Sequence, residues 1–214
     1  MKYYLLFLSI FFSPTVSSQT WDVIIKRSNY TSYFERDYLA PTVVVYTLLN
    51  GGGECDRDKF DFRNDRKSLK TATNENYRNS GWDRGHLAPT EDFAYNCKLS
   101  ELTFRYYNCI PQHPKLNRGS WKSVENEVRR LSKNRRIVVM CINIFGKDYL
   151  PNSRVGIPTE CIKLVWDYNT GEAIAGWVFQ NNSNASVVRK NPSQIITEKR
   201  LVNVRSILDT TRSK

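Results

Sequence analysis

The sequence predicts an α+β fold rather than a doubly wound α/β fold. Segments rich in β-branched residues occur both early and late in the chain, and the clearest helical pattern lies between them. No regular alternation of strand, helix and strand connects these segments, and no internal repeat is visible. We therefore expect a mixed or antiparallel sheet flanked by helices, in one domain that spans residues 19–214.

The expected strands have the composition of buried β-structure. Residues 40–50 read APTVVVYTLLN and are followed by three glycines, which is typical of a buried strand that ends in a turn. Residues 136–146, 159–168 and 172–181 predict two or three further strands, and NTG between the last two indicates a hairpin. Residues 54–70 are charged and irregular, so we expect a loop that crosses the surface or faces phosphate.

One helix is clearly indicated by the spacing of apolar residues. In the segment NRGSWKSVENEVRRLSKN, residues 117–134, the basic side chains occupy the other faces of the expected helix. The C-terminal tail is expected to end in a short helix. The apolar positions that define the first helix are Trp121, Val124, Val128 and Leu131.

The N-terminus has the pattern of a secretory signal peptide. Lys2 precedes an apolar run, Tyr3 to Phe12, which is much shorter than the roughly 20 residues that a membrane-spanning helix needs. Val16 and Ser18 occupy the −3 and −1 positions of a cleavage site after residue 18. We therefore expect residues 1–18 to be removed and the remaining chain to be secreted, with no stable membrane association.

The charge of the chain points to polyanionic partners. The formal net charge is +11, and removing residues 1–18 takes away one lysine and leaves +10. Such an excess favours nucleic acid, anionic lipid or acidic glycans. The alternative is that the charge only keeps a secreted protein soluble. A membrane-active basic toxin is disfavoured, because the sequence has no long amphipathic cationic helix.

Cysteines and glycosylation motifs fit a secreted chain. In an oxidising compartment, five cysteines suggest up to two disulfides with one thiol left over, and their spacing does not match a zinc site. Three Asn-x-Ser/Thr motifs are candidate glycosylation sites. The cysteines are Cys55, Cys97, Cys109, Cys141 and Cys161, and the motifs begin at Asn29, Asn181 and Asn184.

The segment GWDRGHLAPT, residues 81–90, is the first candidate for chemistry. Histidine is the usual general base near neutral pH, and the chain has only two, His86 and His113. His113 lies between two prolines and is expected in a surface loop. Beside His86, Arg84 offers a planar fork suited to phosphate, and Gly85 permits a close backbone approach. The alternative is a strand-to-loop junction whose polar residues satisfy one another.

A second candidate group lies at the start of the predicted helix. Asn117, Trp121 and Glu125 are each four residues apart, so on a continuous helix they form one stripe. Amide and carboxylate oxygens are ligands that Mg²⁺ accepts, and this ion commonly keeps several waters. The alternative is that Asn117 only caps the helix and Glu125 only faces solvent.

Together, YRNSGWDRGHLAP and, about 20 residues later, NCIPQHPKLNRGSWKSVE resemble the DNA/RNA non-specific endonuclease family. The resemblance implies the ββα-metal (His-Me finger) nuclease fold. In this family His86 resembles the general base that activates water, and Asn117 resembles the side chain that holds Mg²⁺, for which Mn²⁺ is a possible substitute. Glu125 resembles the residue that braces the waters around the metal. Arg84 resembles an arginine that supports phosphate binding.

The resemblance also implies an upstream arginine that stabilises the transition state. The charged segment before the motif offers three candidates, and the sequence does not choose among them: Arg57, Arg63 and Arg66.

The sequence therefore predicts a secreted Mg²⁺-dependent endonuclease that acts on DNA and RNA and leaves 5′-phosphate and 3′-hydroxyl ends. Low sequence specificity agrees with recognition through phosphates, which carry no direct base information. The alternative function is a catalytically silent basic protein that binds nucleic acid or glycans on the same fold. The sequence leaves open whether the protein forms a homodimer.

Overall fold

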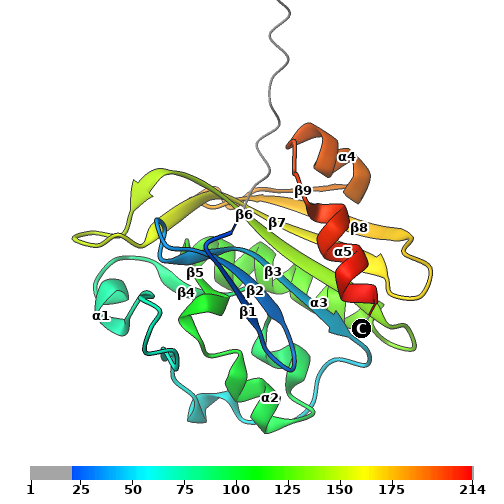
Figure 1. The fold of residues 1–214 in the computed structure, drawn as a ribbon, viewed down its shortest axis with the longest axis horizontal. Helices are drawn as coiled ribbons and strands as arrows, with labels where there is room; N and C mark the ends of the chain where they lie inside the picture. The colour runs from blue at the N-terminus through cyan, green and yellow to red at the C-terminus, as the bar shows by residue number, and fades with distance from the viewer. Residues whose placement is uncertain (1–20, 214) are drawn as a thin grey trace, which may run out of the picture.

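The computed structural model describes residues 21–213, so the expected signal peptide, residues 1–18, lies outside the described residues. The α+β prediction is confirmed (Figure 1). A seven-stranded antiparallel sheet has the order β1-β2-β3-β6-β7-β8-β9, and a separate antiparallel pair is formed by β4 and β5. The large sheet consists of β1 (Val23–Lys26), β2 (Thr31–Glu35), β3 (Ala40–Leu48), β6 (Ile137–Tyr149), β7 (Gly156–Asp167), β8 (Ala173–Gln180) and β9 (Val187–Lys190).

The central strands are buried on both faces, which explains their nearly continuous apolar sequence. In β6, Val138, Met140 and Ile142 pack in one apolar cluster. The alternate residues Val139 and Cys141 pack in a second cluster on the opposite face of the sheet. The four sequence segments predicted as strands correspond to β3, β6, β7 and β8, whereas the short strands β1, β2, β4, β5 and β9 had no clear signal.

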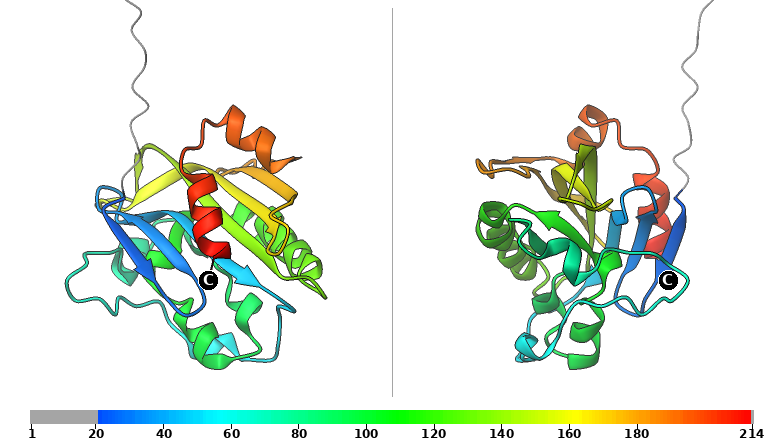
Figure 2. Two further views of the ribbon diagram at one scale, coloured as in Figure 1. Left: turned by 45° about the vertical axis from the view of Figure 1, so that its right-hand side comes forward. Right: turned by 90° about the vertical axis from the view of Figure 1, so that its left-hand side faces the viewer.

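Helices cover the two faces of the sheet. α4 (Pro192–Glu198) and α5 (Val204–Arg212) contribute apolar residues to one cluster. α3 (Lys122–Leu131) contributes Val124 and Val128 to the other. The right-hand view of Figure 2 shows α3 and α5 on opposite sides of the strands. The C-terminal tail thus ends in a short helix, α5, as expected, and a further helix, α4, precedes it.

A strand-strand-helix unit lies on the α3 side of the sheet. β4 (Asp83–His86) pairs with β5 (Cys109–Gln112), with Gly85 opposite Ile110 and His86 opposite Cys109. A π-helical turn, Leu116–Trp121, follows β5 and continues into α3. This unit agrees with the ββα arrangement expected from the sequence, and it places the DRGH motif across from the helix.

The cysteine prediction needs correction. One disulfide, Cys55–Cys97, is present, and three buried cysteines are unpaired rather than one. The strand register places Cys141 opposite Lys163 and Cys161 opposite Asn143, so these two cysteines are diagonal neighbours. Diagonal neighbours in antiparallel strands lie about 7–8 Å apart, beyond the usual span of a disulfide. The third unpaired residue is Cys109.

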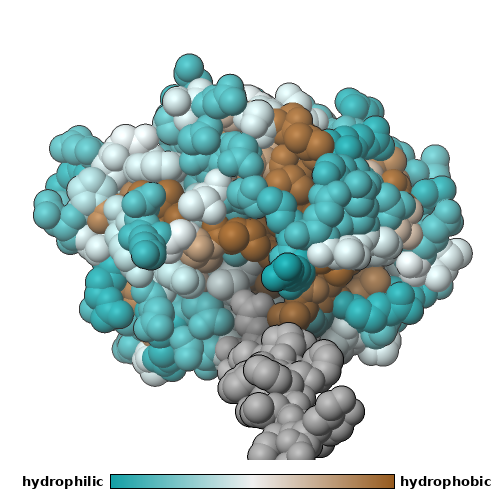
Figure 3. Space-filling model, turned by 90° about the horizontal axis from the view of Figure 1, so that it is seen from above, coloured by the Kyte–Doolittle hydropathy of each residue, from teal (hydrophilic) through white to brown (hydrophobic). Residues whose placement is uncertain are grey.

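Short helices and loops complete the surface around the β4-β5 pair. Residues 54–70 cross the surface as predicted, with one 3₁₀ turn, Arg57–Lys59. The remaining short elements are α1 (Asn74–Tyr77), the 3₁₀ turns Thr90–Phe93 and Tyr106–Asn108, and α2 (Cys97–Leu102). The face in Figure 3 is mostly hydrophilic, with apolar patches between polar groups. Among residues 21–213, no helix has the length and apolar character needed to cross a membrane.

Candidate active site

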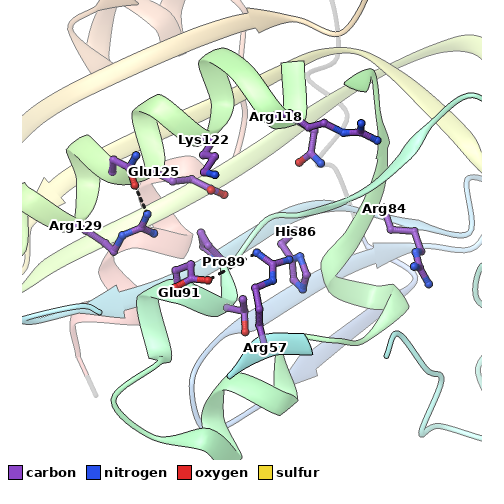
Figure 4. Close-up of a pocket in the computed structure, with 12 residues that line it drawn as sticks. Arg57, Arg84, His86, Pro89, Glu91, Arg118, Lys122, Glu125 and Arg129 are labelled. Carbon is purple, nitrogen blue, oxygen red and sulfur yellow. Dashed lines mark hydrogen bonds and ion pairs between the residues drawn. The ribbon is translucent and has the colours of Figure 1, made fainter. Parts of the chain in front are cut away.

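A pocket of about 540 Å³ lies between β4 and α3, and it contains all four residues predicted from the sequence. Figure 4 shows Glu125 and Lys122 on the helix facing His86 and Arg57 across the pocket. The lining residues are Arg57, Arg84, His86, Pro89, Thr90, Glu91, Asn117, Arg118, Lys122, Glu125, Asn126 and Arg129. Five of them are basic and two are acidic, so the pocket suits an anion.

His86 is held rigidly by aromatic rings and is neutral. It is only 9% exposed, with its ring centroid 4.5 Å from that of Phe62 and 4.7 Å, edge to face, from that of Phe104. Burial, followed by the positive charges of Arg57 and Arg84, lowers the pKa of His86 to about 3. Its Nε2 has no hydrogen-bond partner among the described residues. A neutral imidazole with an unpartnered nitrogen can accept a proton.

Gly85 allows the close approach that the sequence suggested. A Cβ atom at this position would lie 2.2 Å from Oε1 and 2.6 Å from Cγ of Gln112. Gln112 is fully buried in β5 and cannot move into solvent. The glycine therefore lets the two strands of the ββα unit pack tightly behind His86.

The expected helical stripe of Asn117, Trp121 and Glu125 is wrong. The helix is interrupted at Gly119, which has φ −109° and ψ −109°, so Asn117 precedes the kink and Glu125 follows it. Trp121 is 1% exposed and packs in the core. Asn117 and Glu125 nevertheless both line the pocket, because the widened turn changes the direction of the side chains before α3.

Asp83 orients Asn117. The Nδ2 of Asn117 donates a hydrogen bond to Oδ2 of Asp83 at 3.0 Å, and Arg118 donates to the same carboxylate at 2.6 and 2.8 Å. Burial alone would raise the pKa of Asp83, but the hydrogen bonds from Arg118 and Asn117 lower it overall. With Nδ2 engaged, the Oδ1 of Asn117 accepts no hydrogen bond from the residues described here, and it is available to a ligand.

Glu125 is half-buried on the opposite wall of the pocket. Burial raises the pKa of its carboxyl group to about 7, and the positive charge of nearby Lys163 opposes this shift. Lys163 is itself fully buried, with Nζ 4.2 Å from the ring centroid of Trp121. A carboxyl group with a pKa near neutrality can accept or release protons, and a cation bound nearby favours its ionised form.

A buried ion pair fixes the two walls of the pocket relative to each other. Asp92, in the turn that follows the DRGH motif, accepts a hydrogen bond of 2.8 Å from Arg129 on α3 and another of 2.8 Å from Tyr46 on β3. Asp92 is fully buried, and the Arg129 side chain is 16% exposed. Removing one partner of such a pair leaves an uncompensated buried charge, so the pair holds the turn against α3.

Of the three upstream arginines, only Arg57 lines the pocket. Its guanidinium lies 3.8 Å from the carboxylate of Glu91, also in the pocket wall (Figure 4). Arg63 pairs instead with Glu101 on α2. Arg66 does not line the pocket either.

The loop that carries Arg57 is attached to the segment after His86. The backbone N–H of Cys55 donates to the carbonyl of Ala94 at 3.1 Å, and its side chain forms the disulfide with Cys97. A Cβ atom on Gly53 would meet the Ala94 backbone at 2.2 Å, so glycine is required for this approach. These contacts place Arg57 beside His86, although the two residues are far apart in the sequence.

The residues fit a divalent cation with few protein ligands. The available Oδ1 of Asn117 and the Glu125 carboxylate are oxygen donors of the kind that Mg²⁺ accepts. Within residues 21–213, no group of three or more His, Cys, Asp or Glu residues could hold a metal ion by itself. A cation here would take most of its ligands from water and substrate.

Several pocket residues were not predicted from the sequence. Arg118, Lys122, Asn126 and Arg129 follow one another at intervals of four, four and three residues, and this spacing could have revealed the polar face of the helix. Glu91 carried no periodic signal, and Arg57 was one of three arginines that the sequence could not separate. His113 lies outside this pocket, as expected, where it is half-buried and its Nδ1 accepts a hydrogen bond from the N–H of Lys115 at 3.2 Å.

Two of the three candidate glycosylation sites are used inside the fold. Asn29 is 8% exposed, and its Nδ2 donates to the carbonyl of Leu99 at 2.9 Å. Asn181 is 4% exposed, and its Nδ2 donates to the carbonyls of Pro111 and Pro158. These side chains are structural, whereas Asn184 is exposed.

Comparisons with known proteins agree with the geometry. Human mitochondrial endonuclease G is 34% identical over 53% of this chain and 43% of its own length, and the bovine protein is 32% identical over 65% and 52%. A salivary endonuclease of Lutzomyia longipalpis is 32% identical over 51% of this chain and 29% of its own. The chain thus spans about half the length of the endonuclease G proteins it matches.

The fold matches that of a solved structure described as the EndoG/EndoGI complex. The TM-score is 0.70 at 24% identity, and the match covers 84% of each chain. The model of the DNA/RNA non-specific endonuclease family matches residues 9–211. Nucleases of this family generally depend on a divalent metal ion. The ββα unit, the pocket that it forms and the extent of the match lead to one conclusion: the chain belongs to the DNA/RNA non-specific endonuclease family.

Proposed function

We propose that residues 19–214 form a secreted, Mg²⁺-dependent endonuclease domain that hydrolyses phosphodiester bonds of both DNA and RNA. The observation that carries this proposal is that the neutral, rigidly held His86 lines the same strongly basic pocket as Asn117 and Glu125. The family match and the net charge, +11 for the full chain and +10 without residues 1–18, support nucleic acid as the substrate. Mn²⁺ has similar ligand requirements and could substitute for Mg²⁺.

In the proposed reaction, His86 accepts a proton from the water that attacks phosphorus. Arg57 and Arg84 bind the non-bridging oxygens, and the positive charge of Arg57 compensates the charge that builds up in the transition state. Asn117 would hold the cation, and Glu125 would brace the waters around it. When bound, such an ion supplies further neutralisation of the phosphate and lowers the pKa of its waters. The bond between phosphorus and the 3′ oxygen breaks, and this oxygen takes up a proton from solvent water, which gives 5′-phosphate and 3′-hydroxyl ends.

The test is digestion of supercoiled plasmid and single-stranded RNA by the purified chain, with Mg²⁺, with Mn²⁺ and with a chelator. We expect cleavage of both substrates with either metal and none with the chelator. His86→Ala should lower kcat by about 10²- to 10⁴-fold with little change in nucleic-acid binding, because it removes only a general base. His113→Ala is the matched control, because it removes the other histidine from outside this pocket.

Arg57 is tested against a neighbour that carries the same charge. Arg57→Ala should lower kcat by about 10²- to 10³-fold, the usual loss when a donor to the transition state is removed. Arg63→Ala removes an arginine that pairs with Glu101 away from the pocket, and it should retain most activity. Equal losses in the two variants would contradict the assignment of Arg57. Absence of cleavage by folded wild-type protein with any divalent metal would favour the alternative of a binding protein.

A further inference from the structure

A second pocket, of about 590 Å³, adjoins the basic pocket and is lined by no residue of α3. The two pockets share four lining residues: Arg57, Arg84, His86 and Asn117. If a phosphate is bound at these shared residues, the part of the nucleic-acid strand on one side of it would lie in one pocket and the part on the other side in the other pocket. We call the second one the aromatic pocket, defined by Phe60, Phe62, Tyr77, Trp82 and Phe104.

The linings of the two pockets differ in the chemistry that they offer. The basic pocket has five basic and two acidic residues and no Phe, Tyr or Trp. The aromatic pocket has five aromatic residues, and its three arginines are nearly balanced by Asp61 and Asp83. A nucleic-acid strand presents anionic phosphates and planar, uncharged bases, and aromatic side chains bind bases by stacking. The basic pocket thus suits phosphates, and the aromatic pocket suits a base.

The aromatic pocket is preformed and continuous with His86. Its floor, Phe62, Tyr77 and Phe104, is buried, and the Phe62 ring packs against the His86 ring at a tilt of 41°. Phe60 and Trp82 are half-buried, so part of each ring is exposed to a ligand. Phe60 packs 5.6 Å from the ring centroid of Phe104, which fixes its orientation without covering it. A rigid, partly exposed ring is a low-entropy surface for stacking.

We propose that the aromatic pocket binds the nucleobase on one side of the scissile phosphate, by stacking on Phe60 and Trp82. This inference rests on the proposed phosphodiesterase function. Stacking accepts any base, since every base has a π face, so the pocket adds affinity without sequence specificity. A base in this pocket has left the helical stack, so single-stranded segments bind at lower cost than intact duplex.

The first experiment changes the substrate and leaves the protein intact. A short single-stranded oligonucleotide carries phosphorothioate links at all positions but one, and an abasic nucleotide is placed on either side of that one phosphodiester. Loss of the base on one side should lower kcat/KM by about 5- to 150-fold, the range for one stacked base. Loss on the other side should have a smaller effect. Equal effects on the two sides, or no effect, would overturn the proposal.

The second experiment removes the stacking surface. In Phe60→Leu/Trp82→Leu, kcat/KM on the intact oligonucleotide should fall, and the abasic nucleotide should no longer cause a further loss. Trp82→Phe keeps an aromatic ring, so the abasic nucleotide should still lower kcat/KM in this variant. This single variant provides a test even if the double variant does not fold. Tyr149→Ala removes an exposed aromatic residue of β6 that lines neither pocket and should also keep the penalty. An undiminished penalty in the folded double variant would refute the stacking site.

A binding assay separates this inference from the proposed reaction. Fluorescence anisotropy of the same oligonucleotides is measured with wild-type protein in chelator. The intact strand should bind more tightly than the strand that lacks the critical base. If the wild type cleaves nothing but shows this difference, the proposed function fails and the base site stands. If it cleaves without any abasic penalty in rate or binding, the base site fails alone.

Discussion

Gly85→Ala is expected to destabilise the protein through a clash with one identified side chain. The added Cβ would lie 2.2, 2.5 and 2.6 Å from the Oε1, Cδ and Cγ atoms of Gln112, far inside ordinary contact distance. Gln112 is fully buried on β5, so it must shift within the core or push β4 away. Overpacking of this kind costs about 1–3 kcal/mol. For a chain of this size, that corresponds to a decrease in Tm of roughly 2–12 °C.

A double-mutant cycle measures the clash directly. Gln112→Ala removes the opposing atoms and carries its own cavity cost, so we compare the effect of Gly85→Ala in the two backgrounds by urea unfolding. The penalty should be present in the wild type and largely absent in Gln112→Ala. Cleavage by Gly85→Ala alone should also fall, because His86 is the next residue on the displaced strand. An equal penalty in both backgrounds would refute the clash as its cause.

Three further predictions follow from the disulfide, the buried histidine and the glycosylation motifs. Cys55→Ala/Cys97→Ala removes a cross-link between residues 42 positions apart in the sequence. The loss of chain entropy in the unfolded state caused by this cross-link corresponds to about 4 kcal/mol, so urea unfolding should show a decrease in unfolding free energy of this order. The value of kcat should also fall, because the loop that carries Arg57 is no longer attached to Cys97. The pKa of His86 is lowered to about 3 from 6.5, so only the unfolded state binds this proton between these pH values, and stability is lost as pH falls through this window. Urea unfolding should show about 1–2 kcal/mol more loss between pH 6.5 and 5 for wild type than for His86→Leu, and parallel curves would contradict the buried neutral imidazole. In a host that glycosylates secreted chains, mass spectrometry should find a glycan only at Asn184, because the Nδ2 atoms of Asn29 and Asn181 are buried in hydrogen bonds. Asn184→Gln should abolish this glycan. A glycan on Asn29 or Asn181 would contradict the fold.

Local sequence patterns were sufficient for the long elements. The β-branched segments in β3 and β6–β8 and the apolar spacing in α3 identify these elements, because their side chains must alternate or recur at a fixed period to reach the core. β4 and β5 have only four residues each, too few for a period to appear. They are stable as strands because they pair with each other, with Gly85 accommodating Gln112.

The sequence by itself identified the residues of the candidate site that lie within two short motifs. Arg84 and His86 are two residues apart on a strand, and Asn117 and Glu125 belong to one turn-helix segment, so both pairs are local. Even here, the continuous stripe was wrong, because the kink at Gly119 depends on packing that spacing does not reveal. Trp121 packs in the core, whereas Asn117 and Glu125 line the pocket.

Only the tertiary structure decided the parts that depend on contacts between distant segments. Arg57 is distinguished from Arg63 by the attachment of its loop through Cys55 and Cys97, and no local pattern encodes that pairing. The aromatic pocket likewise joins Phe60 on this loop with Trp82 beside β4. Periodicity reports which side of an element faces the core, because that preference is set by neighbours along the chain. Which elements contact one another is set by the packing of the whole chain. The sequence alone therefore left the choice among the upstream arginines open, and the fold resolves it.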